Sequence, residues 1–314
     1  MIAQPMARVL SSARRILLAG CGGGYDVLGA VPLYAELSAD PTREVFFASL
    51  SFTYLNGLDG AHRDAEAPSL YEVPAAAATA DTYCPEAWLA KWLSERSGRP
   101  QSVWAFDKTG VRPLAHAYQV LVKRLALDAV VLIDGGIDAI LRGDESSLGT
   151  PSEDLTSLAA VRTLAIPTKI LTCVGLGAEI RDGICHEQVF GRMAELGREG
   201  GYLGAAALTP TTAAGASYRD AVAYVFENQQ TQKRSHVHEV ISAAMLGRFG
   251  DEGRPHVWLS PLLNMYWFFD LETVTRTHLF LDELSDTLRI WDVVARIEAI
   301  RASLEVRERS RIPI

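Results

Sequence analysis

The chain has 314 residues, of which 48% are hydrophobic, and a formal net charge of −8 at pH 7. This composition supplies enough apolar surface for a sizeable core and excludes global disorder, and the length suits one large domain or two small ones. The acidic balance, with no long run of Lys or Arg, argues against nucleic acid or an anionic membrane as the main partner.

Targeting and cysteine patterns point to the cytoplasm. Residues 1–15 do not have the pattern of a signal peptide, because their apolar part is broken and the arginines follow it. The apolar runs of the chain are short and interrupted, so no membrane span is expected. Four cysteines without CxxC spacing fit a reducing compartment better than a disulfide framework or a zinc knuckle: Cys21, Cys84, Cys173 and Cys185.

The first half of the chain alternates apolar runs with amphipathic segments. Strands are predicted at 15–20, 45–50, 103–106 and 129–133, and helices at 25–37, 85–96 and 111–127. Between them, residues 56–81 combine Gly, Pro, Asp and a run of alanines, which predicts an irregular segment. We expect the loop 56–84 to be an insertion or a lid.

The second half continues the same alternation. Strands are predicted at 169–174, 202–208 and 257–259, and helices at 151–164, 187–196, 212–227, 236–249 and 284–308. The run Thr150-Pro151-Ser152-Glu153 predicts a capping box with proline at N1 for the first of these helices. Strands that alternate with helices indicate a mainly parallel sheet covered on both faces. The predicted fold is a single α/β domain over 1–314, with three α/β/α layers and a mainly parallel, Rossmann-like sheet.

A glycine-rich loop follows the first predicted strand and precedes a helix. Its candidate binding residues are Gly22, Gly23, Gly24, Tyr25 and Asp26. Glycines let the backbone approach a ligand closely and a helix N-terminus attracts anions, so a phosphate, a nucleotide or the carboxylate of a cofactor could bind here. A purely structural turn is the alternative.

This loop also resembles the first motif of NAD-binding Rossmann proteins and class I methyltransferases. However, Asp26 and Val27 stand where the third glycine is expected. In addition, the second strand runs into Ser49-Leu50-Ser51 and lacks the acid that would hold an adenosine ribose. NAD or SAM is therefore the less favoured ligand.

Acids and glycines follow the apolar run 129–133 and form the most informative part of the sequence. Its candidate catalytic residues are Asp134, Asp138, Asp144 and Glu145, and its candidate binding residues are Gly135, Gly136, Arg142 and Thr150. In open α/β sheets, ligands bind at the carboxyl ends of the strands. The carboxylates could hold Mg²⁺ or another hard cation, with Asp134 and Asp138 as ligands. They could instead supply a general base with a raised pKa, or recognise an amine or sugar hydroxyls.

A simpler interpretation is that several of these acids are solvated surface charges. It applies to Asp144, Glu145, Glu153 and Asp154, with Glu153 also capping a helix. Likewise, Asp138 and Arg142 are four residues apart and would form an ordinary ion pair on a helix. Asp134 directly follows a buried strand and precedes two glycines, which favours a functional role for it.

Three further segments contain candidate site residues. Glu179 lies in a glycine loop after the 169–174 strand, either in the same cleft or as an ordinary loop residue. His236 and His238 begin a helix and are candidates for proton transfer, although an N-cap role of Ser235 would also explain the segment. Asn264 and Tyr266 belong to an aromatic run that would form either a wall of an apolar pocket or part of the core.

Four of these segments together resemble the DUF1152 domain proteins of archaea and bacteria. The matching segments span nearly the whole chain in order: 20–27, 134–138 with 142–145, 148–151 with 153–154, and 261–270. The chain departs from the family pattern at 235–238, where a run closer to Ser-Ile-Val-Asn is expected. The resemblance implies a Rossmann-like α/β fold and implies little about activity.

The favoured hypothesis for function is an enzyme of small-molecule metabolism. It would catalyse group transfer or hydrolysis on a nucleotide-like or phosphorylated polar substrate, with the glycine loop holding an anionic group and the acidic loop supplying acid–base or divalent-cation chemistry. A SAM- or NAD-dependent enzyme is the second hypothesis, and a non-catalytic ligand-binding protein is the third. A homodimer is expected, since that is the commonest oligomer.

Overall fold

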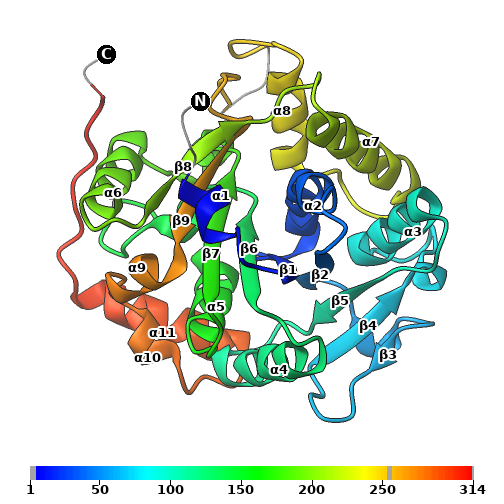
Figure 1. Ribbon diagram of the computed structural model, residues 1–314. Helices are drawn as coiled ribbons and strands as arrows, with labels where there is room; N and C mark the ends of the chain where they lie inside the picture. Colours follow the sequence, from blue (N-terminus) through cyan, green and yellow to red (C-terminus); the bar gives the residue numbers. More distant parts are fainter. Residues whose placement is uncertain (1–4, 253–256, 313–314) are drawn as a thin grey trace.

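The computed structural model describes residues 5–252 and 257–312 of the chain. A nine-stranded sheet runs through its centre in the order β3-β4-β5-β2-β1-β6-β7-β9-β8 (Figure 1). The strands are β1 (Arg15–Gly20), β2 (Glu44–Leu50), β3 (His62–Arg63), β4 (Leu70–Pro74), β5 (Ser102–Phe106), β6 (Ala129–Asp134), β7 (Thr168–Val174), β8 (Tyr202–Ala207) and β9 (Met265–Asp270).

Five central strands, β5-β2-β1-β6-β7, are parallel to one another. From β1 the chain first adds β2 and β5 on one side, and then crosses to add β6 and β7 on the other side. This is the strand order of a doubly wound sheet of the Rossmann type, in which a crevice forms where the order reverses. That switch point lies here at the carboxyl ends of β1 and β6.

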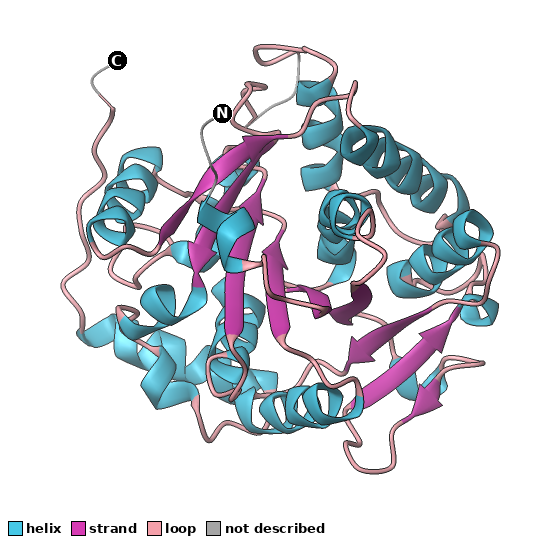
Figure 2. Cartoon of the chain, in the orientation of Figure 1, coloured by secondary structure: helices cyan, strands magenta, loops and turns pink. Residues whose placement is uncertain are grey.

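Helices cover both faces of the sheet, which gives the three α/β/α layers (Figure 2). The α-helices are α1 (Pro5–Val9), α2 (Val31–Leu37), α3 (Pro85–Ser97), α4 (Val111–Arg124), α5 (Pro151–Val161), α6 (His186–Arg198), α7 (Ala213–Asn228), α8 (His236–Met245), α9 (Leu271–Arg276), α10 (Leu281–Leu284) and α11 (Ile290–Ser303). Short 3₁₀ helices connect some elements: η1 (Gly24–Ala30), η2 (Leu55–Gly57), η3 (Ala75–Ala77), η4 (Asp138–Ile140) and η5 (Ala178–Asp182). None of the helices in the described ranges is long and apolar enough to cross a bilayer.

The side chains of β1 show how the two faces are covered. Leu17 and Ala19 pack in the core that includes apolar residues of α4, α5, α6 and α11. Ile16 and Leu18 point the other way, into the core built with α2, α3, α7 and α8. Because successive side chains of a strand alternate between faces, a strand buried on both sides is apolar throughout, which is why these runs were recognisable in the sequence.

The strand predictions were wrong at two places. The segment predicted as irregular contains β3 and β4, which extend the sheet by antiparallel pairing of β4 with the edge of β5. The strand predicted at 257–259 is absent, and Leu259 forms only an isolated bridge with Gly250. The aromatic run nearby instead forms β9, which pairs antiparallel with β7 and β8. The role of 56–84 as a lid and the single-domain division remain predictions.

Three helix predictions also needed correction. The helix predicted at 25–37 begins as the 3₁₀ helix η1 and becomes α-helical only at Val31. The capping box predicted at Thr150 is absent, because the Thr150 side chain makes no capping hydrogen bond and Glu153 pairs with Lys108 instead. Of the helix predicted at 284–308, only Ile290–Ser303 is helical, as α11, apart from Leu284, where α10 ends. The predicted N-cap at Ser235 is confirmed, since its side chain accepts a hydrogen bond from the His238 amide.

Candidate functional site

Five acidic side chains gather at the switch point of the sheet, and we refer to them as the five-carboxyl cluster. They are Asp26 in η1 after β1, Asp134 at the end of β6, Asp138 in η4, Asp154 in the first turn of α5 and Glu179 in η5 after β7. Asp26 is half-buried, and the other four are at most 8% exposed. The carboxyl ends of three neighbouring parallel strands thus place acids from distant parts of the chain in one buried site.

Glycines give these carboxyls the room to approach the backbone. A Cβ added at Gly22 would lie 2.8 Å from Asp154 Oδ1 and 2.9 Å from Asp26 Oδ2. A Cβ at Gly135 would lie 2.4 Å from Asp26 Oδ1, and one at Gly136 would lie 2.5 Å from Glu179 Oε2. Since real Cβ atoms do not make such contacts, the glycines of the two predicted loops are needed by the cluster itself.

Within the cluster, Asp26, Asp134 and Asp154 form a triad. One carboxylate oxygen from each lies within 4.8 Å of the other two. Asp26 Oδ2 accepts a hydrogen bond from the Gly22 amide at 2.8 Å, and Asp134 Oδ2 accepts one from the Ala139 amide at 3.3 Å. Asp154 Oδ1 is buried without a hydrogen-bond partner among the described residues. The triad therefore has unused acceptor capacity at a largely buried position.

Asp138 and Glu179 form the second half of the cluster. Asp138 Oδ2 accepts a hydrogen bond from the Thr150 amide at 2.9 Å, and Glu179 Oε2 accepts one from the Ile137 amide at 2.7 Å. Each of these two carboxyls also perturbs the pKa of the other, so their side chains lie close together. Neighbouring buried carboxyls are an arrangement suited to proton transfer.

The environment of the cluster disfavours ionisation. Burial raises the pKa of Asp26 to about 7, even though hydrogen bonds from backbone amides lower it. Burial, followed by the negative charge of the neighbouring carboxyls, raises the pKa values of Asp134, Asp154 and Glu179 well above their ordinary range. Over the ranges 5–252 and 257–312, no Lys, Arg or His forms an ion pair with any of the five.

The glycine loop lies beside an aromatic and a basic side chain. A Cβ added at Gly23 would lie 2.8 Å from Phe52, whose ring is 49% exposed. The Lys108 ammonium lies 4.8 Å from the centre of that ring and also pairs with Glu153. Gly22 and Asp26 are only half-buried. The cluster thus reaches the surface near this loop.

Arg142, Asp144 and Glu145, which the sequence placed in the site, belong to a separate group that we call the arginine-paired cluster. Arg142 Nη2 lies 2.7 Å from Asp144 Oδ2, and Arg307 Nη2 lies 2.6 Å from Glu145 Oε1. Glu145 also accepts hydrogen bonds from the Arg142 and Gly143 amides. These contacts attach the C-terminal segment to the loop after β6, which is a structural task.

The predicted histidine and polar residues of the last third also have structural contacts. His238 is buried, with Nδ1 2.7 Å from Tyr218 Oη and Nε2 2.8 Å from the Tyr25 carbonyl oxygen. Burial lowers the pKa of His238 to about 4, so the ring is neutral at physiological pH. The Asn264 amide donates to the Leu208 carbonyl, and the Tyr266 hydroxyl donates to the Gly29 carbonyl. His236 is half-buried at the start of α8 and is not within the five-carboxyl cluster.

Two buried acids are absent from the predicted site residues. Asp154, for which a solvated surface position was the simpler interpretation, is only 3% exposed. Glu86 was not singled out, although it follows Pro85 at the start of α3 and is completely buried. Burial raises the pKa of Glu86 to about 7, and the Cys84 thiol donates a hydrogen bond to Glu86 Oε2 at 3.5 Å. The sequence offered one signal for both buried acids: each lies in the first turn of a helix that begins with proline.

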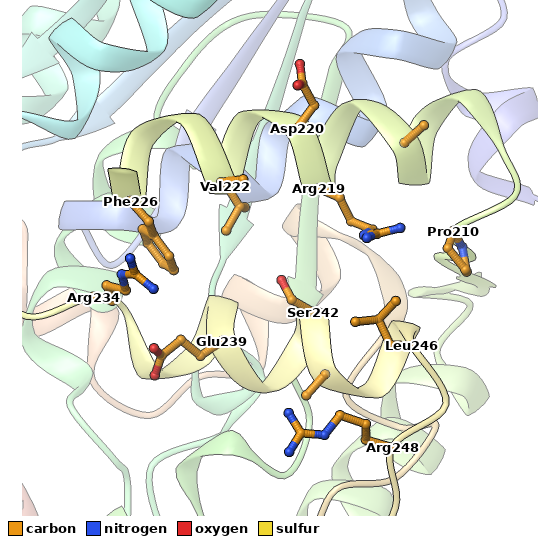
Figure 3. A pocket seen from close by; sticks show the side chains of 13 residues that line it. Pro210, Arg219, Asp220, Val222, Phe226, Arg234, Glu239, Ser242, Leu246 and Arg248 are labelled. Atoms are coloured by element: carbon orange, nitrogen blue, oxygen red, sulfur yellow. The ribbon is translucent and has the colours of Figure 1, made fainter. Parts of the chain in front are cut away.

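A groove of about 620 Å³ lies between α7 and α8, apart from the five-carboxyl cluster (Figure 3). Its apolar lining includes Val222, Phe226 and Leu246, and its basic lining consists of Arg219, Arg234 and Arg248. The Arg234 guanidinium stacks on the Phe226 ring at 5.7 Å. None of the predicted site residues is among the described residues that line this groove.

Fold and site together define a doubly wound α/β protein with a buried group of carboxyls at its switch point. The chain matches the family described as "Protein of unknown function (DUF1152)" over residues 95–309, and it belongs to that family. The matched range contains Asp134, Asp138, Asp154 and Glu179, and it begins after the glycine loop and Asp26. No curated protein and no solved structure matches the chain.

Proposed function

We propose that this protein is an enzyme of small-molecule metabolism that uses the five-carboxyl cluster for group transfer or hydrolysis. The substrate would be a phosphorylated or nucleotide-like polar molecule. The observation that carries the proposal is the burial of five carboxyls together, with no ion pair to any of them among the described residues. Clustered like charge makes folding less favourable, so stability alone gives no reason to assemble it.

Within this proposal, the cluster divides into two tasks. Asp138 and Glu179 would act as the acid–base pair, because a carboxyl with a raised pKa can donate a proton near neutral pH. Asp26, Asp134 and Asp154 would stabilise positive charge in the site, on the substrate or on a cation. Backbone amides of the glycine loop would contact the anionic group of the substrate at the point where the cluster reaches the surface.

The alternative of a SAM- or NAD-dependent enzyme has less support. In a conventional cofactor site the pyrophosphate or methionine would lie over the glycine loop. In this protein Phe52 and Tyr83 lie against Gly23 and Gly24, at the distances of close contact. Movement of both side chains would be required before a dinucleotide could bind. A cytoplasmic location and a homodimer remain predictions.

A turnover screen tests the proposal. Wild-type protein is incubated with phosphorylated metabolites and nucleotides, with Mg²⁺ or with EDTA, and products are followed by mass spectrometry. We expect a substrate that the wild type consumes and that Asp138→Asn consumes at least about a hundredfold more slowly, since general acid–base groups contribute that much to rate. Asp282→Asn, a change of the same chemistry at a side chain that is 90% exposed, is the control and should act like the wild type. Undiminished turnover by Asp138→Asn would contradict the assignment.

A further inference from the structure

The triad within the five-carboxyl cluster has the geometry of a site for a small cation. Hard divalent cations bind carboxylate oxygens at about 2.0–2.6 Å, so two ligands on opposite sides of one ion are separated by about 4–5 Å. The triad places one oxygen from each of Asp26, Asp134 and Asp154 within 4.8 Å of the others. Oxygens within this distance of one another can surround one ion of the size of Mg²⁺, Mn²⁺ or Ca²⁺.

An independent observation comes from the hydrogen bonds of Asp154. Its Oδ1 atom is buried and accepts no hydrogen bond from any described residue, and the side chain is only 3% exposed. A buried acceptor without a donor is unfavourable, and such atoms call for an explanation. This atom faces the backbone of Gly22 at the same place as Asp26 Oδ2. The acceptor that lacks a partner therefore lies next to the space that a side chain at position 22 would fill, as does Asp26 Oδ2.

Gly22 keeps that space open. An added Cβ would lie 2.8 Å from Asp154 Oδ1 and 2.9 Å from Asp26 Oδ2. Gly22 is not among the glycines with positive φ, so its backbone does not itself demand glycine. Room next to the two carboxylates is the physical reason for a glycine at this position. Because Gly22 and Asp26 are half-buried, the same place offers an ion a path from solvent.

We infer that Asp26, Asp134 and Asp154 bind one hard divalent cation of the Mg²⁺, Mn²⁺ or Ca²⁺ class. Oxygen ligands with negative charge select such ions over soft metals. The inference deepens the proposed function, because the open positions of the ion would face the half-buried side of the site and bind an oxyanion such as a substrate phosphate. Asp138 and Glu179 would remain outside the metal's coordination and free to move a proton.

Manganese binding to the full-length protein tests this inference. Free Mn²⁺ is measured by electron paramagnetic resonance during a titration at pH 7.5, after treatment with EDTA and its removal. We expect one Mn²⁺ per chain, which Mg²⁺ or Ca²⁺ displaces. Asp154→Asn and Gly22→Ala should each weaken binding at least about tenfold, since changes of this size follow even from losing a supporting contact at a metal site. The first variant removes a ligand, and the second fills the space with a methyl group.

Two control variants match the chemistry of these changes. Gly197→Ala adds a methyl group in α6 where a Cβ would meet nothing within 4 Å, and Asp282→Asn neutralises an exposed acid. Both should bind Mn²⁺ as the wild type does. Circular dichroism in EDTA checks that every variant is folded, and Asp154→Asn should be at least as stable as the wild type there, so a loss of binding cannot come from unfolding.

The outcomes distinguish a failure of the cation site from a failure of the proposed function. The cation site would be overturned if the wild type did not bind Mn²⁺ stoichiometrically. It would also be overturned if Gly22→Ala and Asp154→Asn bound Mn²⁺ as tightly as the wild type does. Turnover that persists in EDTA would then leave the carboxyls as a metal-free catalytic centre. Conversely, Mn²⁺ binding that depends on the triad, without turnover of any phosphorylated compound, would keep the cation site and reject the proposed substrate class.

Discussion

The loop between β6 and α5 contributes to two acidic clusters that the protein treats in opposite ways. Asp144 and Glu145 face arginines that hold the C-terminal segment in place. Asp134 and Asp138, which precede them by a few residues, accept hydrogen bonds from backbone amides and lie among other carboxyls. Charge paired within the chain stabilises the fold, whereas oxygen acceptors without a cationic partner can bind a ligand. The contrast supports a structural role for the first cluster and, as we propose, a ligand-binding role for the second.

Removing a carboxylate charge should therefore change the free energy of unfolding in opposite directions in the two clusters. Glu145→Gln replaces one carboxylate oxygen, which accepts from the Gly143 or the Arg142 amide, by an amino group, and it removes the negative charge that pairs with Arg307. We expect the free energy of unfolding to fall by about 3 kcal/mol, as for other broken buried pairs. Urea unfolding measures the change, with Asp282→Asn as the control. A gain in stability would remove the distinction between the clusters.

Glu86 is a buried acid that belongs to neither cluster, so it shows the effect of burial without neighbouring carboxyls. Its pKa is raised to about 7 in the folded protein, against 4.5 for an ordinary Glu side chain. The folded state therefore holds a proton that the unfolded state releases, so this contribution to stability is present at low pH and is lost as pH rises from about 4.5 to 7. The loss is on the order of 3 kcal/mol.

Unfolding of the wild type and of Glu86→Gln between pH 4.5 and 8 checks this sign. The amide cannot ionise, so the variant should gain stability relative to the wild type as the pH rises, and the difference should level off above about pH 7. Ionisation of the other buried carboxyls changes the free energy of unfolding equally in both proteins, so it cancels in the difference between them. A difference that is independent of pH would show that Glu86 is ionised in the same range whether the protein is folded or unfolded.

The smallest effect is expected for His238. Its Nδ1 atom contacts the Tyr218 hydroxyl, and its Nε2 atom contacts the Tyr25 carbonyl, which fixes α8 against η1. His238→Gln should lower the free energy of unfolding by about 1–2 kcal/mol through the altered hydrogen bonds, while turnover of the substrate found by screening should remain. His62→Gln, at an exposed position in β3, is the control. Turnover that disappears in a folded His238→Gln protein would restore the catalytic role predicted from the sequence.

Sequence patterns predicted the central strands and Asp134 because both depend on local features. An apolar run buried on both faces is recognisable at any position, and a strand that ends in Asp-Gly-Gly points to the edge where ligands bind. Asp154 was misplaced because its burial depends on how α5 lies over that edge, which no local pattern encodes. Likewise, the partner of Glu145 is Arg307, 162 positions along the chain. Contacts of that length decide whether an acid is structural or functional.

The strands next to the edges of the sheet were harder to predict for a related reason. β4 and β9 have antiparallel partners on both sides, and β4 lacks the continuous apolar run of the central strands. β9 was recognised only as an aromatic run, since its pairing between β7 and β8 depends on a segment that returns after two helices. Pairing of this kind is set by tertiary structure, which outweighs local propensity in strands.

The central claim is that the triad holds charge for a ligand at the expense of stability. It is tested most directly by the free energy of unfolding of the wild type and Asp154→Asn, each measured in EDTA and in excess Mn²⁺. We expect the variant to be more stable in EDTA by about 1–2 kcal/mol, because it removes an unpartnered buried acceptor. In Mn²⁺ this advantage should shrink or reverse, because the wild type gains about 2–3 kcal/mol from a bound ion at a hundredfold excess over its Kd and a variant that binds tenfold more weakly gains about 1 kcal/mol less. A variant that is less stable than the wild type in both solutions by the same amount would contradict the claim and place Asp154 among the structural acids.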